Sequence, residues 1–278
     1  MPAIPAPSQS IRVGDVRITY LPDGVAHFSS GVFPGSSDEC WARHAAETAA
    51  GRWVCSIGGF LIESGDQKVL VDLGFGDAEL EVDGFVTAKS GRLLTSLVEA
   101  GVAPGQIDTV VFTHMHADHT GWTFGGDGLT FANARHLAGP GEVAHWPQHA
   151  GEPFVPVGLE PFVDRFEDST DGESIAPGVQ IVHAGGHTPG HQVVTVSSGA
   201  DRAVILGDTI HCAAQLEEPD LSFMFDVDPG AARRWREDIL DKLQDTGTTV
   251  GACHFNGSAF GRVMTGEGRR YWSPSTSG

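Results

Sequence analysis

The stretch VVFTHMHADHTGW, residues 110–122, decides how this chain is interpreted. Its first residues close a β-branched run, Ile107 to Thr113, that predicts a buried strand. Four side chains that bind metals follow within six residues, and they are His114, His116, Asp118 and His119. Imidazoles two residues apart at a strand end can point to the same side, and the loop that follows can turn the other two donors toward them. The stretch therefore predicts a metal site of nitrogen and oxygen donors, which suit zinc.

Further donors are needed, because four side chains are too few to enclose two metal ions. Three candidates lie downstream, each beside a glycine at a predicted strand end: His187 in AGGHTPGH, Asp208 in LGDTIH and His254 in GACHF. Glycine lets the backbone approach closely and leaves the neighbouring side chain free to enter a cleft. We expect these three residues to complete the site.

Local patterns predict eight strands and three helices along the chain. Strands are expected at 11–21, 60–64, 68–74, 107–113, 179–183, 192–197, 203–207 and 249–253. Helices are expected at 38–50, 90–100 and 228–247, the last with Asp228 as its cap and Pro229 in its first turn. In both halves an apolar strand runs into a histidine, which favours two stacked sheets with helices outside over one doubly wound sheet.

Taken in order, VDLG (71–74), THMHADH (113–119), HTPGH (187–191), GD (207–208) and CHF (253–255) resemble a metallo-β-lactamase-fold hydrolase over about residues 69–255. The resemblance implies an α+β fold with mixed sheets, arranged as a four-layer αββα sandwich with the site at one edge of the two sheets. We predict a single domain at 11–272, with flexible ends at 1–10 and 273–278.

The same resemblance implies the role of each site residue. One metal would be held by His114, His116 and His187, the other by Asp118, His119 and His254, and Asp208 would bridge the two. Asp72 would orient a ligand histidine without binding metal, and His191, like His183, is a candidate for the same supporting role. Two divalent ions are therefore expected, with zinc favoured and Mn, Fe and Co as alternatives.

The chemistry implied is hydrolysis by a hydroxide that bridges the metals, with Asp118 and Asp208 orienting it. The sequence is similar to N-acyl-homoserine lactonases and to the methyl-parathion-hydrolase-like group. Lactonases carry a Tyr three residues after the bridging Asp, where this chain has His211. We assign His211 a catalytic role as hydrogen-bond donor or leaving-group acid, with support of a ligand as the alternative. The bond cleaved is expected to be of ester type: a lactone, a carboxylic ester or a phosphotriester.

A small apolar substrate is expected, with Phe75, Trp122 and Phe255 as candidate pocket walls. Alternative functions are a thioesterase acting on an acyl thioester and, from another class, an iron-dependent oxidoreductase or a non-catalytic metal-binding module. Flavodiiron proteins carry Glu where this chain has His116, which disfavours the oxidoreductase.

Composition limits the partners. The 278 residues hold 17 Lys and Arg against 36 Asp and Glu, a net charge of −19, which opposes binding to nucleic acid or to anionic lipid. We expect neither a nucleic-acid nor a membrane partner, and a monomer or homodimer in the cytoplasm. The four cysteines form no C-x-x-C pair and are predicted to be free thiols.

Overall fold

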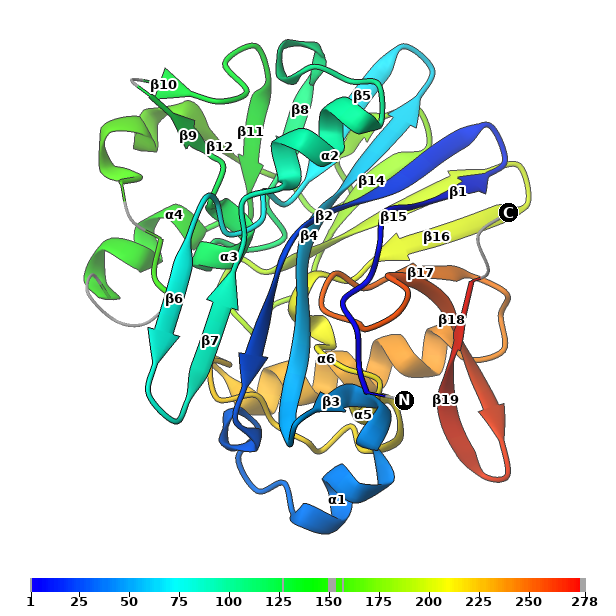
Figure 1. The fold of residues 1–278 in the computed structure, drawn as a ribbon. Helices are drawn as coiled ribbons and strands as arrows, with labels where there is room; N and C mark the ends of the chain where they lie inside the picture. The colour runs from blue at the N-terminus through cyan, green and yellow to red at the C-terminus, as the bar shows by residue number, and fades with distance from the viewer. Residues whose placement is uncertain (1, 127, 150–153, 157, 276–278) are drawn as a thin grey trace.

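Two mixed β-sheets face each other in the computed structural model, which describes residues 2–126, 128–149, 154–156 and 158–275 (Figure 1). The first sheet contains β1 (Gln9–Val13), β2 (Val16–Phe28), β3 (Thr48–Ala49), β4 (Arg52–Ser64), β5 (Gln67–Val71), β6 (Glu79–Val82), β7 (Val86–Lys89), β8 (Thr109–Val111), β11 (Arg135–Ala138) and β12 (Phe166–Asp168). The second contains β13 (Ser174–Ala176), β14 (Val179–His183), β15 (Gln192–Ser198), β16 (Asp201–Ile205), β17 (Thr249–Gly251), β18 (Phe260–Gly266) and β19 (Arg269–Pro274). A small hairpin, β9 (Phe124–Gly125) and β10 (Gly128–Leu129), lies outside both sheets.

Six α-helices are present in the described residues: α1 (Asp38–Arg43), α2 (Leu93–Glu99), α3 (Ala117–Thr120), α4 (Glu142–His145), α5 (Ala214–Glu217) and α6 (Pro229–Leu243). Short 3-10 helices lie at Ser30–Val32, Ala45–Glu47, Pro104–Gln106, Trp146–His149, Glu160–Arg165 and Gly207–Thr209. Helix α2 packs on the outer face of the first sheet, where Leu97 meets Leu61 and Leu70. Helix α6 covers the outer face of the second sheet through Leu240, which joins Val204 and Val250.

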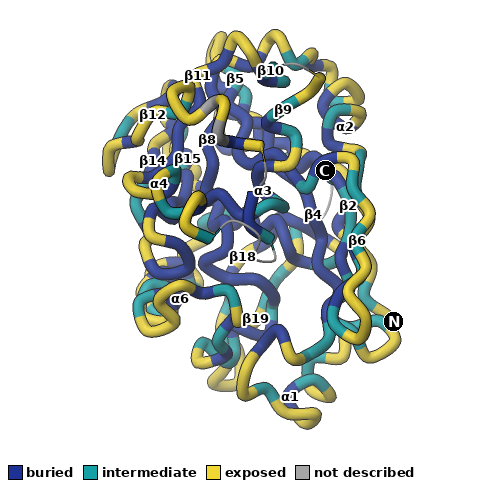
Figure 2. The backbone as a smooth tube through the Cα atoms, turned by 90° about the vertical axis from the view of Figure 1, so that its left-hand side faces the viewer, coloured by how far each residue is buried: buried dark blue, intermediate teal, exposed yellow. Residues whose placement is uncertain are grey.

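The space between the sheets is filled by inward-facing apolar side chains. Ile18 and Ile62 from the first sheet meet Val194 and Ile205 from the second in one buried cluster. Figure 2 shows the central strands in the colour of buried residues, with exposed residues on turns, helix surfaces and outer strands such as β6. The predicted four-layer αββα sandwich with mixed sheets is thereby confirmed.

Strand direction explains where the functional side chains gather. In the first sheet β8 runs parallel to its neighbours β5 and β11, and in the second β16 runs parallel to β17. Parallel neighbours end at the same edge of a sheet. The loops after β5, β8, β16 and β17 therefore emerge together, and they carry Asp72, His114, Asp208 and His254.

Several predicted elements change at their ends. The single strand expected at 11–21 is a hairpin of β1 and β2, because Gly14 and Asp15 form its turn. The helix expected at 38–50 begins as predicted, with Ser37 accepting the Cys40 amide at 3.1 Å, but it ends at Arg43. Two hairpins, β6 with β7 and β18 with β19, escaped the prediction, since their outer strands β6 and β19 contain no buried residue.

The ends of the chain are better anchored than the sequence suggested. Strand β1 already begins at Gln9, and the Ala3 amide donates to the Thr48 carbonyl at 3.1 Å. Strand β19 continues to Pro274, whereas residues 276–278 of the predicted tail lie outside the described residues. The domain bounds of 11–272 stay a prediction. No helix in the described part of the chain combines the length and the apolar character needed to cross a bilayer.

Candidate metal centre

Three histidines form a compact group, called here the first histidine group: His114 and His116 after β8, and His187 in the loop after β14. His116 Nδ1 lies 2.8 Å from His114 Nε2 and 3.0 Å from His187 Nε2. All three side chains are buried. Three ring nitrogens thus converge on one point, although their residues are up to 73 positions apart in sequence.

A second histidine group consists of His119 and His254, with Asp118 at its edge. The Asp118 carboxylate lies 3.9 Å from His119 Nε2 and 3.7 Å from His254 Nε2. Its side chain is 19% exposed, whereas those of the two histidines are almost fully buried. Asp118 is therefore the member of this group that is most open to solvent.

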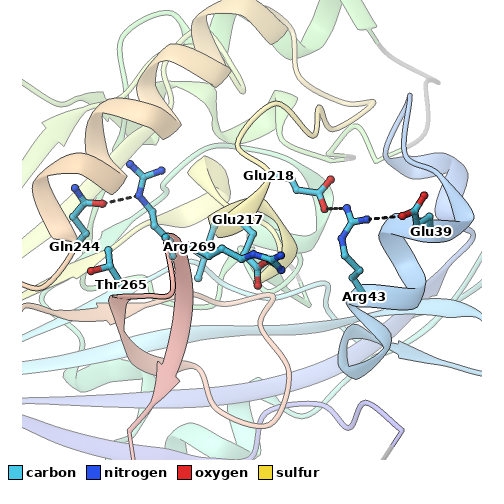
Figure 3. A pocket seen from close by; sticks show the side chains of 10 residues that line it. Glu39, Arg43, Glu217, Glu218, Gln244, Thr265 and Arg269 are labelled. Atoms are coloured by element: carbon cyan, nitrogen blue, oxygen red, sulfur yellow. Dashed lines mark hydrogen bonds and ion pairs between the residues drawn. The ribbon is translucent and has the colours of Figure 1, made fainter.

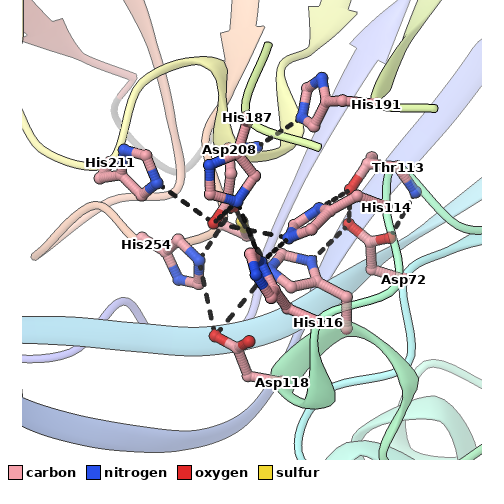
Figure 4. A network of polar contacts seen from close by, with 12 residues as sticks. Asp72, Thr113, His114, His116, Asp118, His187, His191, Asp208, His211 and His254 are labelled. Carbon is pink, nitrogen blue, oxygen red and sulfur yellow. Dashed lines mark hydrogen bonds and ion pairs between the residues drawn. The ribbon is translucent and has the colours of Figure 1, made fainter. Parts of the chain in front are cut away.

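Asp208 lies between the two groups, with one carboxylate oxygen turned toward each (Figure 4). Its Oδ2 is 3.5 Å from His187 Nε2 and 3.8 Å from His114 Nε2. Its Oδ1 is 3.0 Å from His254 Nε2 and 3.3 Å from His119 Nε2. A carboxylate so placed can connect two cations.

The donors fit divalent metal ions in their chemistry and in their surroundings. His119 Nε2 is buried and has no hydrogen-bond partner in the described structure, an arrangement that costs free energy unless another group satisfies the atom. Imidazole nitrogen and carboxylate oxygen are donors that zinc and its neighbours accept. The seven residues predicted to bind metal are therefore brought together in one place.

Charge within this cluster is unevenly distributed. Burial, followed by the neighbouring imidazoles, holds the pKa values of His114 and His116 well below their usual range, so both rings are neutral and free to donate electron pairs. Burial also opposes charge on His119 and His254, but Asp208 outweighs it and raises the pKa values of both rings. The imidazoles in turn hold the pKa of the Asp208 carboxyl well below its usual value, against the effect of burial.

Asp72 supports the second group without joining it. Its Oδ2 lies 3.0 Å from His119 Nδ1, and its two oxygens also accept the Thr113 amide and hydroxyl, each at 2.8 Å. The Asp72 backbone has φ of 60°, a conformation that non-glycine residues rarely adopt. This conformation places the carboxylate against the loop that carries His114 to His119, as its predicted supporting role requires.

His191 supports Asp208 through the backbone. The Asp208 amide donates to His191 Nε2 at 3.0 Å, and the other ring nitrogen lies 3.1 Å from the Ala184 carbonyl. Gly207, with φ of 52°, makes this approach possible, because a Cβ there would lie 2.8 Å from His191 Nε2 and 2.7 Å from the Thr113 Cβ. His183 is directed elsewhere, with its Nε2 3.2 Å from the Ser169 hydroxyl.

His211 lies beside Asp208, with Nε2 3.3 Å from Oδ2. Its ring stacks on Phe223 at a centroid distance of 3.8 Å, and Gln215 Oε1 accepts the His211 backbone amide at 2.7 Å. Burial lowers the pKa of this ring. Because His211 is fully buried beneath Phe223, its contacts suit positioning of Asp208 better than the predicted direct contact with substrate.

A narrow cavity opens onto His116, Asp118, Asp208 and His254. Aromatic rings form its walls, and they are those of Phe28, Trp53, Phe154, Phe223 and Phe225. The rings support one another, with Phe154 and Phe225 at 5.0 Å and Phe223 and Phe225 at 5.5 Å between centroids. The cavity is therefore apolar on the side facing away from the donors.

The aromatic residues predicted to line this pocket lie elsewhere. Phe255 is buried against Trp272 in the layer beneath α6, with the rings 4.7 Å apart. The Trp122 indole donates to Asp23 at 2.9 Å, and Phe75, whose amide donates to the same aspartate at 2.7 Å, joins the packing next to the cavity. Nearness to a ligand motif in sequence was a poor guide, because side chains alternate in direction along an extended chain.

Three buried acids that hold the site together escaped the sequence analysis. Glu142 accepts the Met115 amide and the Trp146 indole on Oε1 and the Gly190 amide on Oε2, so it ties the His114–His119 loop to the His187–His191 loop. Asp226 lies 2.8 Å from His187 Nδ1, and Asp23 accepts the Leu93 amide at 2.8 Å. The only local indication of their role is that each is an acidic residue within an otherwise apolar segment.

The fold and these donor groups define an αββα protein with a histidine and aspartate centre at the sheet edge. The chain belongs to the metallo-β-lactamase superfamily, whose family model matches residues 55–254. The resemblance stated from sequence is thus confirmed.

Curated relatives include an N-acyl homoserine lactonase from Bacillus sp, 27% identical over 159 residues that cover 53% of this chain and 60% of that protein. One from Bacillus thuringiensis is 24% identical over 163 residues, with the same coverage. The chain thus spans about 60% of the length of the curated relatives it matches.

Solved structures extend the match to the full chain. The hydrolase AbOPH of the β-lactamase superfamily has a TM-score of 0.84 at 25% identity and covers 98% of both chains. AidC, a dizinc quorum-quenching lactonase solved with a product, has a TM-score of 0.79 at 22% identity and covers 97% of both chains. The second likeness is one of fold.

Proposed function

We propose that this protein is a dinuclear metal-dependent hydrolase that cleaves an ester-type bond, a lactone or a carboxylic ester, in a small apolar substrate. The observation that carries the proposal is the position of Asp208, whose two oxygens face the two histidine groups at the floor of an aromatic cavity. The lactonase relatives and the fold shared with AidC support the choice of substrate.

Each histidine group would hold one divalent ion, for which zinc is our choice, with Asp208 shared between the two. Bound there, the ions would supply Lewis acidity toward a carbonyl oxygen and lower the pKa of water. The neutral His114 and His116 rings suit this task, because a neutral imidazole keeps a lone pair on one of its two nitrogens.

The remaining work falls to the chain's own side chains. Asp118, the most accessible carboxylate of the centre, would take a proton from the attacking water and give it to the leaving oxygen. The rings of Phe28, Phe154 and Phe225 would hold the apolar part of the substrate and exclude other water. His211 would keep Asp208 in place from beneath Phe223.

The experiment measures metal content and turnover together in the zinc-loaded full chain. A γ-lactone, an aryl ester, an acyl thioester and a phosphotriester form the substrate panel. We expect two equivalents of metal at the histidine centre and turnover of the lactone or the aryl ester. A chain with both metals that turns over only the thioester or the phosphotriester, or nothing, would overturn the proposal.

Asp208→Asn tests the bridging position directly. The amide can offer one oxygen at most, so we expect the loss of at least one metal ion. Turnover should fall by more than the ~10–100-fold that is typical when a residue that only hydrogen-bonds to a metal ligand is replaced. Asp201→Asn is the matched control, since Asp201 is exposed at the start of the strand that leads to Asp208. Equal activity in both variants would refute the bridging role.

A further inference from the structure

A second group of metal-binding side chains lies on α1 and at the end of α5, and it shares no residue with the histidine centre. It consists of Cys40, His44 and Glu218, whose donor atoms all lie within 4.8 Å of one another. The sulfur, nitrogen and oxygen they offer form a donor set that zinc accepts. We propose that Cys40, His44 and Glu218 form an additional zinc-binding site.

Local structure holds the first two donors in register. Ser37 caps α1 by accepting the Cys40 amide, and the His44 amide donates to the Cys40 carbonyl at 3.1 Å. Residues four apart on a helical turn lie on the same face, so the Cys40 thiol and the His44 imidazole project together. This spacing allows one short helix to supply two ligands to a single ion.

The third donor has the separation that a tetrahedral ion requires. His44 Nε2 lies 3.3 Å from Glu218 Oε1. Two donors bound tetrahedrally at ~2.0–2.1 Å from zinc are about 3.3 Å apart. The nitrogen and the oxygen are thus already spaced as they would be around the ion.

Access to the site comes from an open groove of about 810 Å³, lined in part by Glu39, Arg43 and Glu218 (Figure 3). Cys40 is buried, the His44 side chain is 9% exposed and that of Glu218 is 31% exposed. The ion would enter on the Glu218 side, where water from the groove can complete four-coordination.

Arg43 competes for the same carboxylate. Its guanidinium pairs with Glu218 and also lies 3.7 Å from Glu39, its neighbour four residues earlier (Figure 3). Zinc binding would move Arg43 from Glu218 toward Glu39. Removing the Arg43 charge should therefore strengthen metal binding, an effect opposite to that of removing a ligand.

Occupation of this site would join α1 to the part of the chain that supports the catalytic cavity. Glu218 follows α5, whose Gln215 holds His211. On the other side, Trp41 of α1 packs on Phe33, which packs on Phe223, at ring distances of 5.3 and 5.4 Å. Zinc bound here would cross-link the outer wall of the cavity and raise the melting temperature of the protein.

The test uses the full chain loaded with cobalt(II), because a thiolate ligand produces a charge-transfer band in the near ultraviolet. We expect this band in the native chain. The Cys40→Ser variant should lack the band and should bind one equivalent of metal fewer. The control variant Cys253→Ser should keep the band. A chain without the band, or a band that survives Cys40→Ser, overturns the proposal. This readout does not depend on turnover, so it stands or falls separately from the proposed hydrolase activity.

Two further variants keep the test decisive if Cys40→Ser folds poorly. His44→Gln removes a more accessible ligand and should also abolish the additional equivalent. Arg43→Gln should increase the affinity of that equivalent by about tenfold, since a cation is removed from the vicinity of the bound ion. Arg269→Gln is its control, because Arg269 lines the same groove but pairs with Glu217. An unchanged affinity in Arg43→Gln would contradict the assignment.

Discussion

The carboxylate of Asp72 lies 3.0 Å from His119 Nδ1, and this contact decides which nitrogen of His119 faces the centre. With Nδ1 engaged, Nε2 points toward Asp208 at 3.3 Å. Asp72 can do this because it also accepts both donors of Thr113 and because its backbone adopts a strained, left-handed conformation. The metal centre thus depends on a residue that would not itself bind metal.

Asp72→Asn should weaken metal binding by the second histidine group about 10–100-fold, because the amide no longer offers two oxygens to three donors. Titration of the metal-free chain with zinc, followed by a competing chelator dye, measures the change. Asp66→Asn, in the exposed turn between β4 and β5, serves as the control. An unchanged affinity would show that the His119 ring is oriented by packing alone.

Glu142→Gln should loosen the link between the two ligand loops. An amide retains one acceptor oxygen, so the Gly190 N–H would face an NH₂ group in a fully buried position. We expect a loss of about 1–3 kcal/mol in the free energy of unfolding, together with weaker metal binding by the first histidine group. Urea denaturation with and without zinc separates the two effects, and the exposed Glu79→Gln is the reference. If zinc stabilises both variants equally, Glu142 contributes to stability alone.

Phe225→Ala opens the aromatic wall of the cavity. Loss of apolar contact should lower kcat/KM for a long-chain or aryl substrate by about tenfold, mainly through KM, and leave a short-chain lactone nearly unaffected. Phe255→Ala is the informative comparison, because this ring is buried beneath α6 and not in the cavity. It should cost about 3–5 kcal/mol of stability without altering substrate preference. A changed substrate preference in Phe255→Ala would show that this side chain does line the pocket.

The Glu47 carboxyl should make the free energy of unfolding depend on pH. Burial raises the pKa of this carboxyl from 4.5 to about 7, although a hydrogen bond from Asn256 partly opposes the shift. The folded chain therefore binds this proton more tightly than the unfolded chain does. The stabilisation is complete below pH 4.5 and is lost as the pH rises through about 7.

Glu47→Gln should remove this loss, since glutamine stays neutral throughout. At pH 8 the variant should exceed the native chain by about 1–3 kcal/mol in unfolding free energy, and near pH 4 the two should be similar. Chemical denaturation across this range provides the measurement, with Glu79→Gln as control. A difference that does not vary with pH would assign the effect to packing.

Sequence patterns were most successful where a residue's role depends on its immediate neighbours. Asp228 was expected to cap a helix, and its side chain accepts the Ala231 amide at 2.8 Å. Patterns failed for β18 and β19, because β19 is an edge strand with no buried residue and its pairing with β18 depends on contacts across the sheet.

The same difference between local sequence and long-range contacts applies to the metal centre. By itself, the sequence determined the chemistry: short motifs at strand ends identified the histidines and aspartates that converge, because ligand type and local spacing are encoded side by side. Tertiary structure alone decided that Asp208 faces both groups, that Glu142 ties two loops, and that Phe28, Phe154 and Phe225 form the cavity wall. These relationships join residues far apart in the chain, and they arise only when two sheets pack and bring their strand ends to one edge.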